Sequence, residues 1–363
     1  MLMPSSTSSS EVTGLRRFAC RVGLFLLIQC AIAIAVLLPF ARQAPDTYIA
    51  ALQTKYDRLR SAASPRLLLV GSSNLAFSFD SAQIRSELHL EPVNMGLHQG
   101  LGLPLLLNQA LRNVRQGDVV VLAVEYLHFA CDSTSDTIAE AMLTAPRATV
   151  DGMDWEVFKK VCDQGLALLG RRVRTLALAA VGRMPFRPEQ PYRHDSFNDL
   201  GDVVAHLKLS PQQLPQRRIG KPLHFEPMRV GQVIDRLNAF ADKCRARGAR
   251  VFFTYAPYPH TEFARDREAI EALHSRLSKQ LHAELISRPQ ETVYADNWFY
   301  DMEYHTLAEG TARRTKLVID RLHQRLHPVA APTDHASSQP PTKSAANDQP
   351  AWTWSINSLG SGQ

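Results

Sequence analysis

The sequence predicts an α/β fold in which helices cover both faces of a doubly wound parallel sheet. Short apolar runs that are typical of buried strands alternate with stretches of helical length. The clearest strand is 118–125 (DVVVLAVE), and 66–71 (RLLLVG) and 250–255 (RVFFTY) are of the same kind. Continuously apolar strands that alternate with helices favour a parallel sheet buried on both sides.

The other elements follow from caps, turns and periodicity. The pattern Asp80-Ser-Ala-Gln83 is typical of a capping box and predicts a helix that runs to residue 88. Thr306-Leu-Ala-Glu309 has the same pattern, which predicts Thr306 as the N-cap of the last helix and leaves His305 in the preceding loop. Further strands are expected at 92–95 and 291–294, and further helices at 103–114, 230–247, 262–284 and 307–326.

Composition excludes several classes of protein. The 363 residues are 45% hydrophobic and 21% charged, so the chain can bury a full core and is not globally disordered. Five cysteines rule out a disulfide scaffold, and no cysteine or histidine spacing indicates a zinc site. The net charge of +6 comes from scattered arginines, which predicts solvated faces and no nucleic-acid partner.

An uncharged run of 20 residues at 22–41 predicts a transmembrane helix. At about 1.5 Å per residue it matches the hydrocarbon core of roughly 30 Å. Arg16, Arg17 and Arg21 precede the run, so the positive-inside rule places residues 1–21 in the cytoplasm and the rest of the chain outside. A cleaved signal peptide is the rival interpretation, but it would leave Pro45 at the first mature position.

The remaining chain divides by composition. Residues 42–65 are expected to form a helical stem, and residues 66–327 the α/β domain. An insertion at 130–225, with a helical stretch at 154–181, is expected to lie over the carboxyl ends of the strands. Residues 328–363 are rich in Pro, Ser and Ala and predict a disordered tail.

Three polar loops follow predicted strands or precede the last helix. Gly71-Ser72-Ser73-Asn74 follows the first strand, 94–100 follows the second, and 301–305 precedes the last helix. Open parallel sheets bind ligands at the carboxyl ends of their strands, so we expect these loops to meet there. His305 suits the base of a serine triad, and Asp301, four residues before it, suits the orienting acid better than Asp296 or Glu303 does.

This arrangement resembles the SGNH (GDSL-type) esterase and acyltransferase superfamily over about 66–128 and 250–327. It looks closest to the membrane-anchored periplasmic branch, which includes proteins that acetylate exported polysaccharides. The resemblance implies a flavodoxin-like, three-layer fold and a single-pass protein of the bacterial inner membrane with its C-terminal domain in the periplasm. It also implies Ser73 as nucleophile, His305 as base and Asp301 as acid, with the N–H groups of Ser73 and Gly96 as the oxyanion hole.

The sequence departs from that family at one oxyanion donor. The family has an asparagine after the third strand, where this chain has Val124-Glu125-Tyr126. An ionised Glu125 would repel an oxyanion, and the loss of one donor costs about 3–4 kcal/mol in a well-studied protease. Asn74, Glu125 and Tyr126 are therefore candidate pocket residues, and Asn74, Tyr126 or His128 is a candidate replacement donor. The Asp–His spacing is four rather than the usual three.

The predicted function is that of an esterase or O-acyltransferase that passes an acyl group to water or to a sugar hydroxyl. The expected partners are the membrane, an acyl ester or glycan substrate, and a membrane acyltransferase. No metal or organic cofactor is expected, because nucleophile and base belong to the chain. The alternative is a non-catalytic accessory protein that binds a glycan or a partner in an export complex, which the substitution at Glu125 favours.

Overall fold

The computed structural model describes residues 9–41, 46–131, 136–183 and 189–327. Its centre is a five-stranded parallel sheet in the order β2-β1-β3-β4-β6. Counted within the sheet this is the order 2-1-3-4-5, in which the order of the strands reverses between β1 and β3. Open α/β sheets commonly bind ligands at the carboxyl ends of the strands on either side of such a reversal. The strands are β1 (Arg66–Gly71), β2 (Glu91–Asn94), β3 (Val119–Ala123), β4 (Arg250–Phe253) and β6 (Glu284–Leu285).

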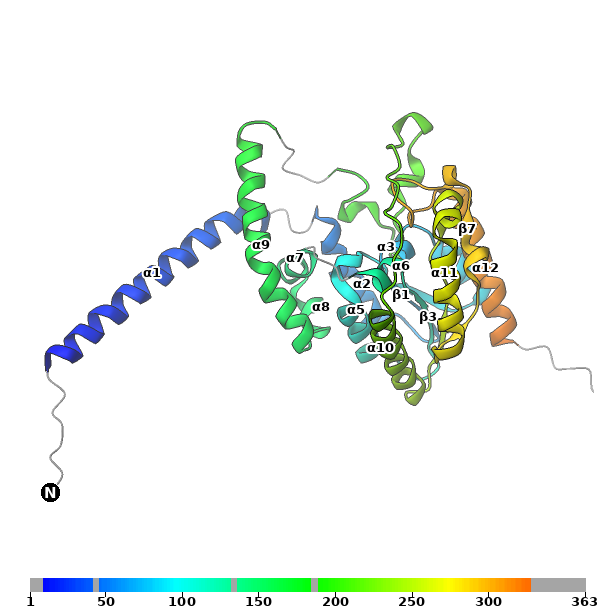
Figure 1. Ribbon diagram of the computed structural model, residues 1–363, viewed down its shortest axis with the longest axis horizontal. Helices are drawn as coiled ribbons and strands as arrows, with labels where there is room; N and C mark the ends of the chain where they lie inside the picture. Colours follow the sequence, from blue (N-terminus) through cyan, green and yellow to red (C-terminus); the bar gives the residue numbers. More distant parts are fainter. Residues whose placement is uncertain (1–8, 42–45, 132–135, 184–188, 328–363) are drawn as a thin grey trace, which may run out of the picture.

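Helices cover both faces of this sheet (Figure 1). Alternate strand residues such as Leu68 and Val120 pack in one core with α5 (Gly102–Asn113), α10 (Pro227–Ala246) and α11 (His260–Gln280). The intervening residues, such as Leu67 and Val121, pack with α4 (Ser81–Leu88) and α12 (Ala308–Leu326). This alternation follows from the two-residue period of a strand, and it confirms the predicted α/β class with a parallel sheet.

Two local expectations are corrected. A strand forms near 291–294 as β7 (Val293–Tyr294), but it pairs with β5 (Tyr258–Pro259) in a separate two-stranded sheet. The fifth strand of the main sheet is β6, which is too short to give a readable period. Thr306 is not the N-cap of α12: Leu307 is, and the Thr306 hydroxyl bonds Thr311 Oγ1 at 2.9 Å instead.

The expected stem is helical but is packed into the body of the protein. It consists of η2 (Tyr48–Ala50) and α2 (Ala51–Ser61). The side chains at the predicted helical spacing, Tyr48, Leu52 and Tyr56, are all buried. Residues 42–45 lie outside the described residues.

The insertion contains the predicted long helix as α9 (Trp155–Ala180), which follows α7 (Thr137–Thr144) and α8 (Pro146–Asp151). Its return segment packs onto the carboxyl side of the sheet, where Val203 N–H donates to Ala76 O at 2.8 Å. The remaining short elements are α3 (Ser73–Ala76), η3 (Gln99–Leu101), α6 (Tyr126–Ala130), η4 (His194–Ser196), η5 (Ala205–Lys208), η6 (Pro211–Gln213), η7 (Pro289–Thr292) and η8 (Asp296–Trp298).

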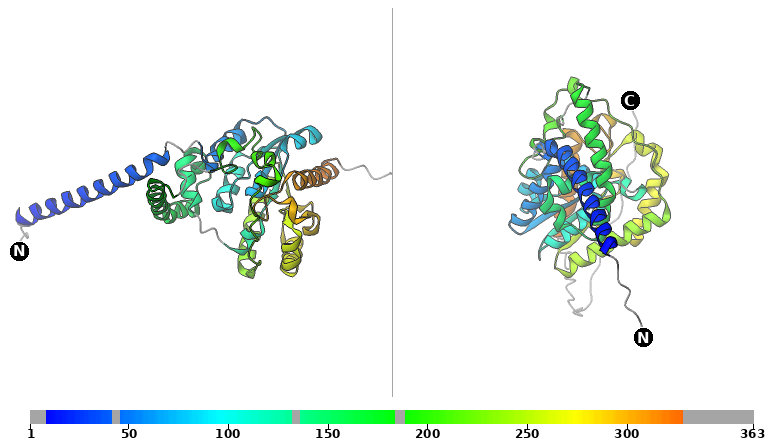
Figure 2. Two further views of the ribbon diagram at one scale, coloured as in Figure 1. Left: turned by 90° about the horizontal axis from the view of Figure 1, so that it is seen from above. Right: turned by 90° about the vertical axis from the view of Figure 1, so that its left-hand side faces the viewer.

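An apolar helix, α1 (Ser9–Ala41), projects from the body on the side where α9 lies (Figures 1 and 2). Its segment Thr13–Val36, 24 residues long, has the length and composition of a membrane span, and none of it is buried in the protein. A signal sequence would have the same properties. The tail expected at 328–363 lies outside the described residues.

Candidate active site

The loop before α12 brings Asp301 and His305 into contact. Asp301 Oδ1 accepts a hydrogen bond from His305 Nδ1 at 2.8 Å, and the imidazole is 2% exposed. The ring of Phe77 stacks on it with centroids 3.8 Å apart and planes 10° apart. His305 Nε2 is buried and has no hydrogen-bond partner among the described residues. The ring is therefore fixed in place with one nitrogen unused.

The second oxygen of Asp301 accepts a hydrogen bond from the hydroxyl of Tyr192, which comes from the insertion. Burial alone would raise the pKa of Asp301, but the hydrogen bonds from His305 and Tyr192 and the charge of His305 outweigh it and lower that pKa. Asp301 is thus held ionised. We call Phe77, Tyr192, Asp301 and His305 the histidine group.

The other two acids near His305 are placed differently. Asp296 accepts hydrogen bonds from the N–H and the hydroxyl of Thr261 at the start of α11. Glu303 is 8% exposed, and burial raises its pKa. Of the three acids considered from the sequence, Asp301 is the one that hydrogen-bonds His305.

Ser73 begins the short helix α3, and Ser72, the N-cap of that helix, separates it from the end of β1. Its Oγ donates to Glu125 Oε1 at 3.2 Å, and the same oxygen accepts from the Asn74 N–H at 3.1 Å. The register explains this contact, because Gly71 pairs with Ala123 and the two chains leave the sheet side by side. Glu125 is 2% exposed. The acid that stands where the resemblance implies an asparagine therefore lies against the expected nucleophile.

Arg314 of α12 stabilises the start of α3 through hydrogen bonds to Asn74. It is fully buried and donates to the carbonyl oxygen and to Oδ1 of Asn74, each at 2.8 Å. Its guanidinium lies over the ring of Phe79, 4.5 Å from the centroid. Burial lowers the pKa of Arg314 to about 9. Because this value is still above 7, the guanidinium stays protonated at neutral pH. We call Ser73, Asn74, Glu125 and Arg314 the serine group.

Gly96 does not offer the donor that the resemblance implies. Its N–H donates to Asn94 Oδ1 at 3.0 Å, so it is already engaged. The glycine is needed for close packing instead, since a Cβ there would lie 2.4 Å from Leu75 Cβ and 2.7 Å from Ser72 O. Asn94 Nδ2 in turn donates to Leu75 O at 2.9 Å, which ties the loop after β2 to α3.

The remaining candidates lie on α6. Tyr126 is buried in the core against Tyr255 and Tyr258, and its hydroxyl has no hydrogen-bond partner among the described residues. Burial raises the pKa of Tyr126, so it remains a phenol. His128 is also buried, and neither of its ring nitrogens has a hydrogen-bond partner among the described residues.

The serine and histidine groups lie at the same edge of the sheet but are not hydrogen-bonded to each other through their reactive atoms. Phe77, one residue beyond α3, stacks on His305, while the Ser73 hydroxyl points to Glu125. The described residues contain no cluster of three His, Cys, Asp or Glu side chains that could hold a metal ion. The arrangement offers a hydroxyl, an oriented imidazole and two buried carboxylates.

Two residues that hold the histidine and serine groups, Tyr192 and Arg314, were not predicted from the sequence. Tyr192 lies in the Pro- and Arg-rich part of the insertion, which has no periodicity. The helical spacing could have indicated Arg314, because it shares the buried face of α12 with Thr311 and Val318. A charged residue on a buried face indicates a specific partner, here Asn74.

No known protein-family model matches this chain, and no curated protein matches it significantly. The fold and the geometry above therefore carry the functional argument.

Proposed function

We propose that this protein is a membrane-anchored serine esterase or O-acyltransferase of the SGNH type. The observation that carries the proposal is the buried Asp301–His305 pair, whose Nε2 has no partner among the described residues. A carboxylate that fixes one imidazole nitrogen leaves the other as a general base. A serine hydroxyl at the start of a helix, at the same sheet edge, is the matching nucleophile.

In the proposed reaction the Ser73 hydroxyl turns from Glu125 toward His305. Its oxygen attacks the acyl carbonyl carbon, and His305 Nε2 takes the hydroxyl proton. The imidazolium then gives this proton to the departing alcohol, which leaves Ser73 acylated. Water or a sugar hydroxyl attacks the acyl-enzyme, His305 accepts its proton, and the proton returns to Ser73 as the acyl group leaves.

Stabilising the oxyanion is the demanding step, because Glu125 lies where a donor would help. The N–H of Ser73 is among the first of α3, and such groups have no acceptor within their own helix. Gly96 is engaged with Asn94. The proposed enzyme thus works with a weaker oxyanion hole than a serine protease has.

The proposed location is the inner membrane, with the α/β domain in the periplasm. The arginines that precede the apolar segment support this orientation. Helix α9, which contacts α1, also exposes large apolar side chains, Trp155 and Leu166 among them, as a surface beside a bilayer would. A reporter that is active only outside the cytoplasm, fused after Ala330, should be active. Activity from a reporter that works only in the cytoplasm would overturn the location.

The second candidate function is a non-catalytic anchored protein that binds a glycan or a partner in an export complex. The hydrogen bond of Ser73 to Glu125, rather than to His305, favours this candidate. In that case the two buried groups would serve to hold loops at the sheet edge. The two candidates differ in one property, the nucleophilicity of Ser73.

Covalent labelling separates these functions. The full chain in detergent is treated with a serine-directed fluorophosphonate, and labelling is followed by intact mass and peptide mapping. We expect one adduct on Ser73, lost in Ser73→Ala and strongly slowed in His305→Gln, with the neighbouring Ser72→Ala as the matched control. An intact wild-type protein that takes up no label at Ser73 would support the non-catalytic function.

A further inference from the structure

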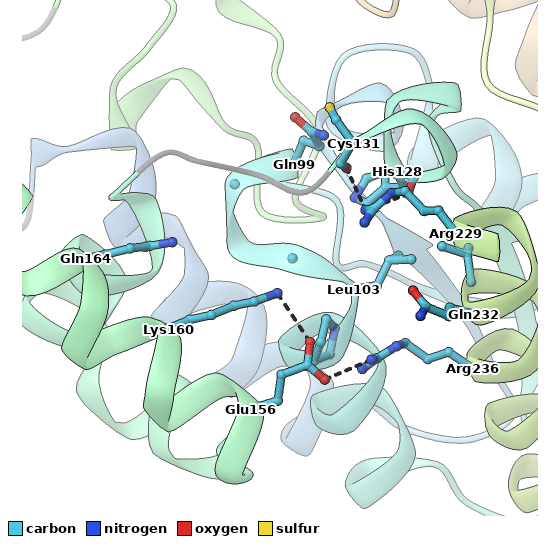
Figure 3. A pocket seen from close by; sticks show the side chains of 14 residues that line it. Gln99, Leu103, His128, Cys131, Glu156, Lys160, Gln164, Arg229, Gln232 and Arg236 are labelled. Atoms are coloured by element: carbon cyan, nitrogen blue, oxygen red, sulfur yellow. Dashed lines mark hydrogen bonds and ion pairs between the residues drawn. The ribbon is translucent and has the colours of Figure 1, made fainter. Parts of the chain in front are cut away.

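A cavity apart from the histidine group lies between α5, α9 and α10, next to α6 (Figure 3). Its volume is about 140 Å³, which suits an ion of a few non-hydrogen atoms. It is separate from the histidine group and borders the serine group through α6, since the His128 N–H donates to Glu125 O at 3.0 Å. None of the residues assigned to the proposed acyl chemistry lines it.

Positive charge dominates the lining. Lys160 comes from α9, and Arg229 and Arg236 come from α10. Glu156 is the one acid among the described residues that line the cavity. Its carboxylate lies 3.3 Å from Lys160 Nζ and 2.8 Å from Arg236 Nη2. Lys160 and Arg236 share this one carboxylate, so these three groups together carry an excess of one positive charge. The two cations approach Glu156 from opposite sides (Figure 3).

The N-terminus of α5 adds to this field. The helix has 12 residues, its N-cap Leu101 supplies no side-chain hydrogen bond, and its first turn contains no acid. Lys160 Nζ lies close to its first residue, 3.9 Å from where a Cβ of Gly102 would be. A lysine ammonium beside the positive end of a helix dipole is unfavourable, and the nearby carboxylate of Glu156 is shared between Lys160 and Arg236. A further anion would therefore stabilise this end of the cavity.

His128 provides the independent sign of a ligand. Its side chain lines the cavity and is 4% exposed, yet neither ring nitrogen has a hydrogen-bond partner among the described residues. Burial lowers the pKa of His128, so the ring is neutral and offers one N–H donor. A buried polar group without a partner is costly, and a ligand oxygen in the cavity would satisfy it.

We propose that this cavity binds a small oxyanion, a carboxylate or a phosphate, between Lys160, Arg236 and the first turn of α5, with His128 as a neutral donor. Arg229 supports the wall by donating to the carbonyl oxygens of His128 at 3.0 Å and Cys131 at 2.6 Å. The proposal concerns binding and does not depend on the acyl chemistry of Ser73.

The test is calorimetric titration of the full chain in detergent with inorganic phosphate and, separately, with acetate; these two probes distinguish the sources of the oxyanion. Chloride at equal ionic strength is the salt control. We expect saturable binding of at least one oxyanion. In Lys160→Gln/Arg236→Gln the affinity should fall by at least about tenfold, because two charge-assisted hydrogen bonds are lost.

The matched control is Lys159→Gln/Arg245→Gln, which removes the same charge from the same two helices at positions that do not line the cavity. It should bind as the wild type does. His128→Phe, which keeps a buried aromatic ring, should also weaken binding and tests the donor without changing charge. Equal affinities in the wild type and the cavity double variant, no saturable binding of either oxyanion, or an equal response to chloride would each overturn the proposal.

Discussion

The histidine group and the serine group lie at the same sheet edge, but their hydrogen bonds differ in kind. In the histidine group, Asp301 and Tyr192 fix the ring of His305 and leave Nε2 unused. In the serine group, the Ser73 hydroxyl is already bonded to the carboxylate of Glu125. In the proposed reaction the base needs no rearrangement, while the nucleophile has to exchange one hydrogen bond for another before it can react.

This difference shows which step of the proposed mechanism is unfavourable, namely the change of hydrogen-bond partner of the Ser73 hydroxyl. Rotation of the Ser73 side chain about χ1 from one staggered rotamer to another is a small change. The lasting cost is electrostatic, because Glu125 stays beside the carbon that Ser73 would attack. The predictions below test each group in turn.

Replacement of Ser73 should have the largest effect. We expect Ser73→Ala to lower esterase turnover by at least about 10⁴-fold, as the loss of a nucleophile does in serine proteases. The melting temperature should change little, because Glu125 keeps the hydrogen bond from the Asn74 N–H. Hydrolysis of a nitrophenyl ester, with Ser72→Ala as the control, measures this. Unchanged turnover would remove Ser73 from the mechanism.

Asp301→Asn comes next. The amide no longer stabilises the imidazolium or the correct tautomer, a loss of about 10⁴ in the serine-protease template, with little change in KM. Glu303→Gln is the matched control and should be mild, because Asp301 rather than Glu303 is the acid that hydrogen-bonds His305. If Asp301→Asn keeps its turnover and Asp296→Asn does not, the acid has been assigned to the wrong residue.

Sequence patterns were sufficient for β1 and β3, because both strands consist mainly of apolar residues. All six residues of β1 and all five of β3 are buried, so composition alone identifies them. The contact of Asp301 with His305 was predicted from their separation, because a spacing of four residues allows the turn that joins them. These contacts are local or follow from the order of the strands.

The rest depends on long-range contacts that no local pattern encodes. Tyr192 reaches Asp301 across 109 residues, and Arg314 reaches Asn74 across 240. The surroundings of Gly96 were not predictable for the same reason: its N–H donates to Asn94 Oδ1, and Leu75 lies where a Cβ would be. Two-residue strands such as β6 are placed by their neighbours rather than by propensity.

Tyr192→Phe tests how much the insertion contributes to the histidine group. It removes one donor to Asp301 and leaves the bond to His305, so we expect turnover to fall by about threefold to tenfold. Because that hydrogen bond helps to lower the pKa of Asp301, its removal should also move the acid limb of the pH–rate profile upward. A variant with the turnover and the pH profile of the wild type would show that Tyr192 only packs there.

Glu125→Gln tests the serine group. The amide keeps an oxygen that can accept from Ser73 and removes the negative charge beside the forming oxyanion. We therefore expect turnover to rise by about threefold or more. Asp202→Asn, another buried acid but one that bonds Ser81 and Asn94, is the control for a general loss of buried charge. A fall in turnover specific to Glu125→Gln would make Glu125 a participant rather than a hindrance.

The smallest effect concerns the buried Lys55, which supports the serine group from the stem. Its ammonium donates to Asn94 O at 2.9 Å, and Asn94 holds the loop after β2 to α3. Burial lowers the pKa of Lys55 to about 7 from an ordinary value of 10.5, although Asp202 opposes the shift. Between these values the unfolded chain keeps a proton that the folded chain has lost.

The sign follows from that difference in bound protons. Stability should rise with pH between about 7 and 10.5 by at most about 1.4 kcal/mol per pH unit for this one proton. Asp301 behaves otherwise: its pKa is lowered, so its contribution is present above its unfolded pKa and is lost only as pH falls through the folded value. Urea unfolding at pH 7, 8 and 9 should therefore give a smaller slope in Lys55→Met than in the wild type, with Lys159→Met, exposed on α9, as the control. Equal slopes in all three proteins would show that Lys55 keeps its proton in the fold and that pH does not distinguish the two groups.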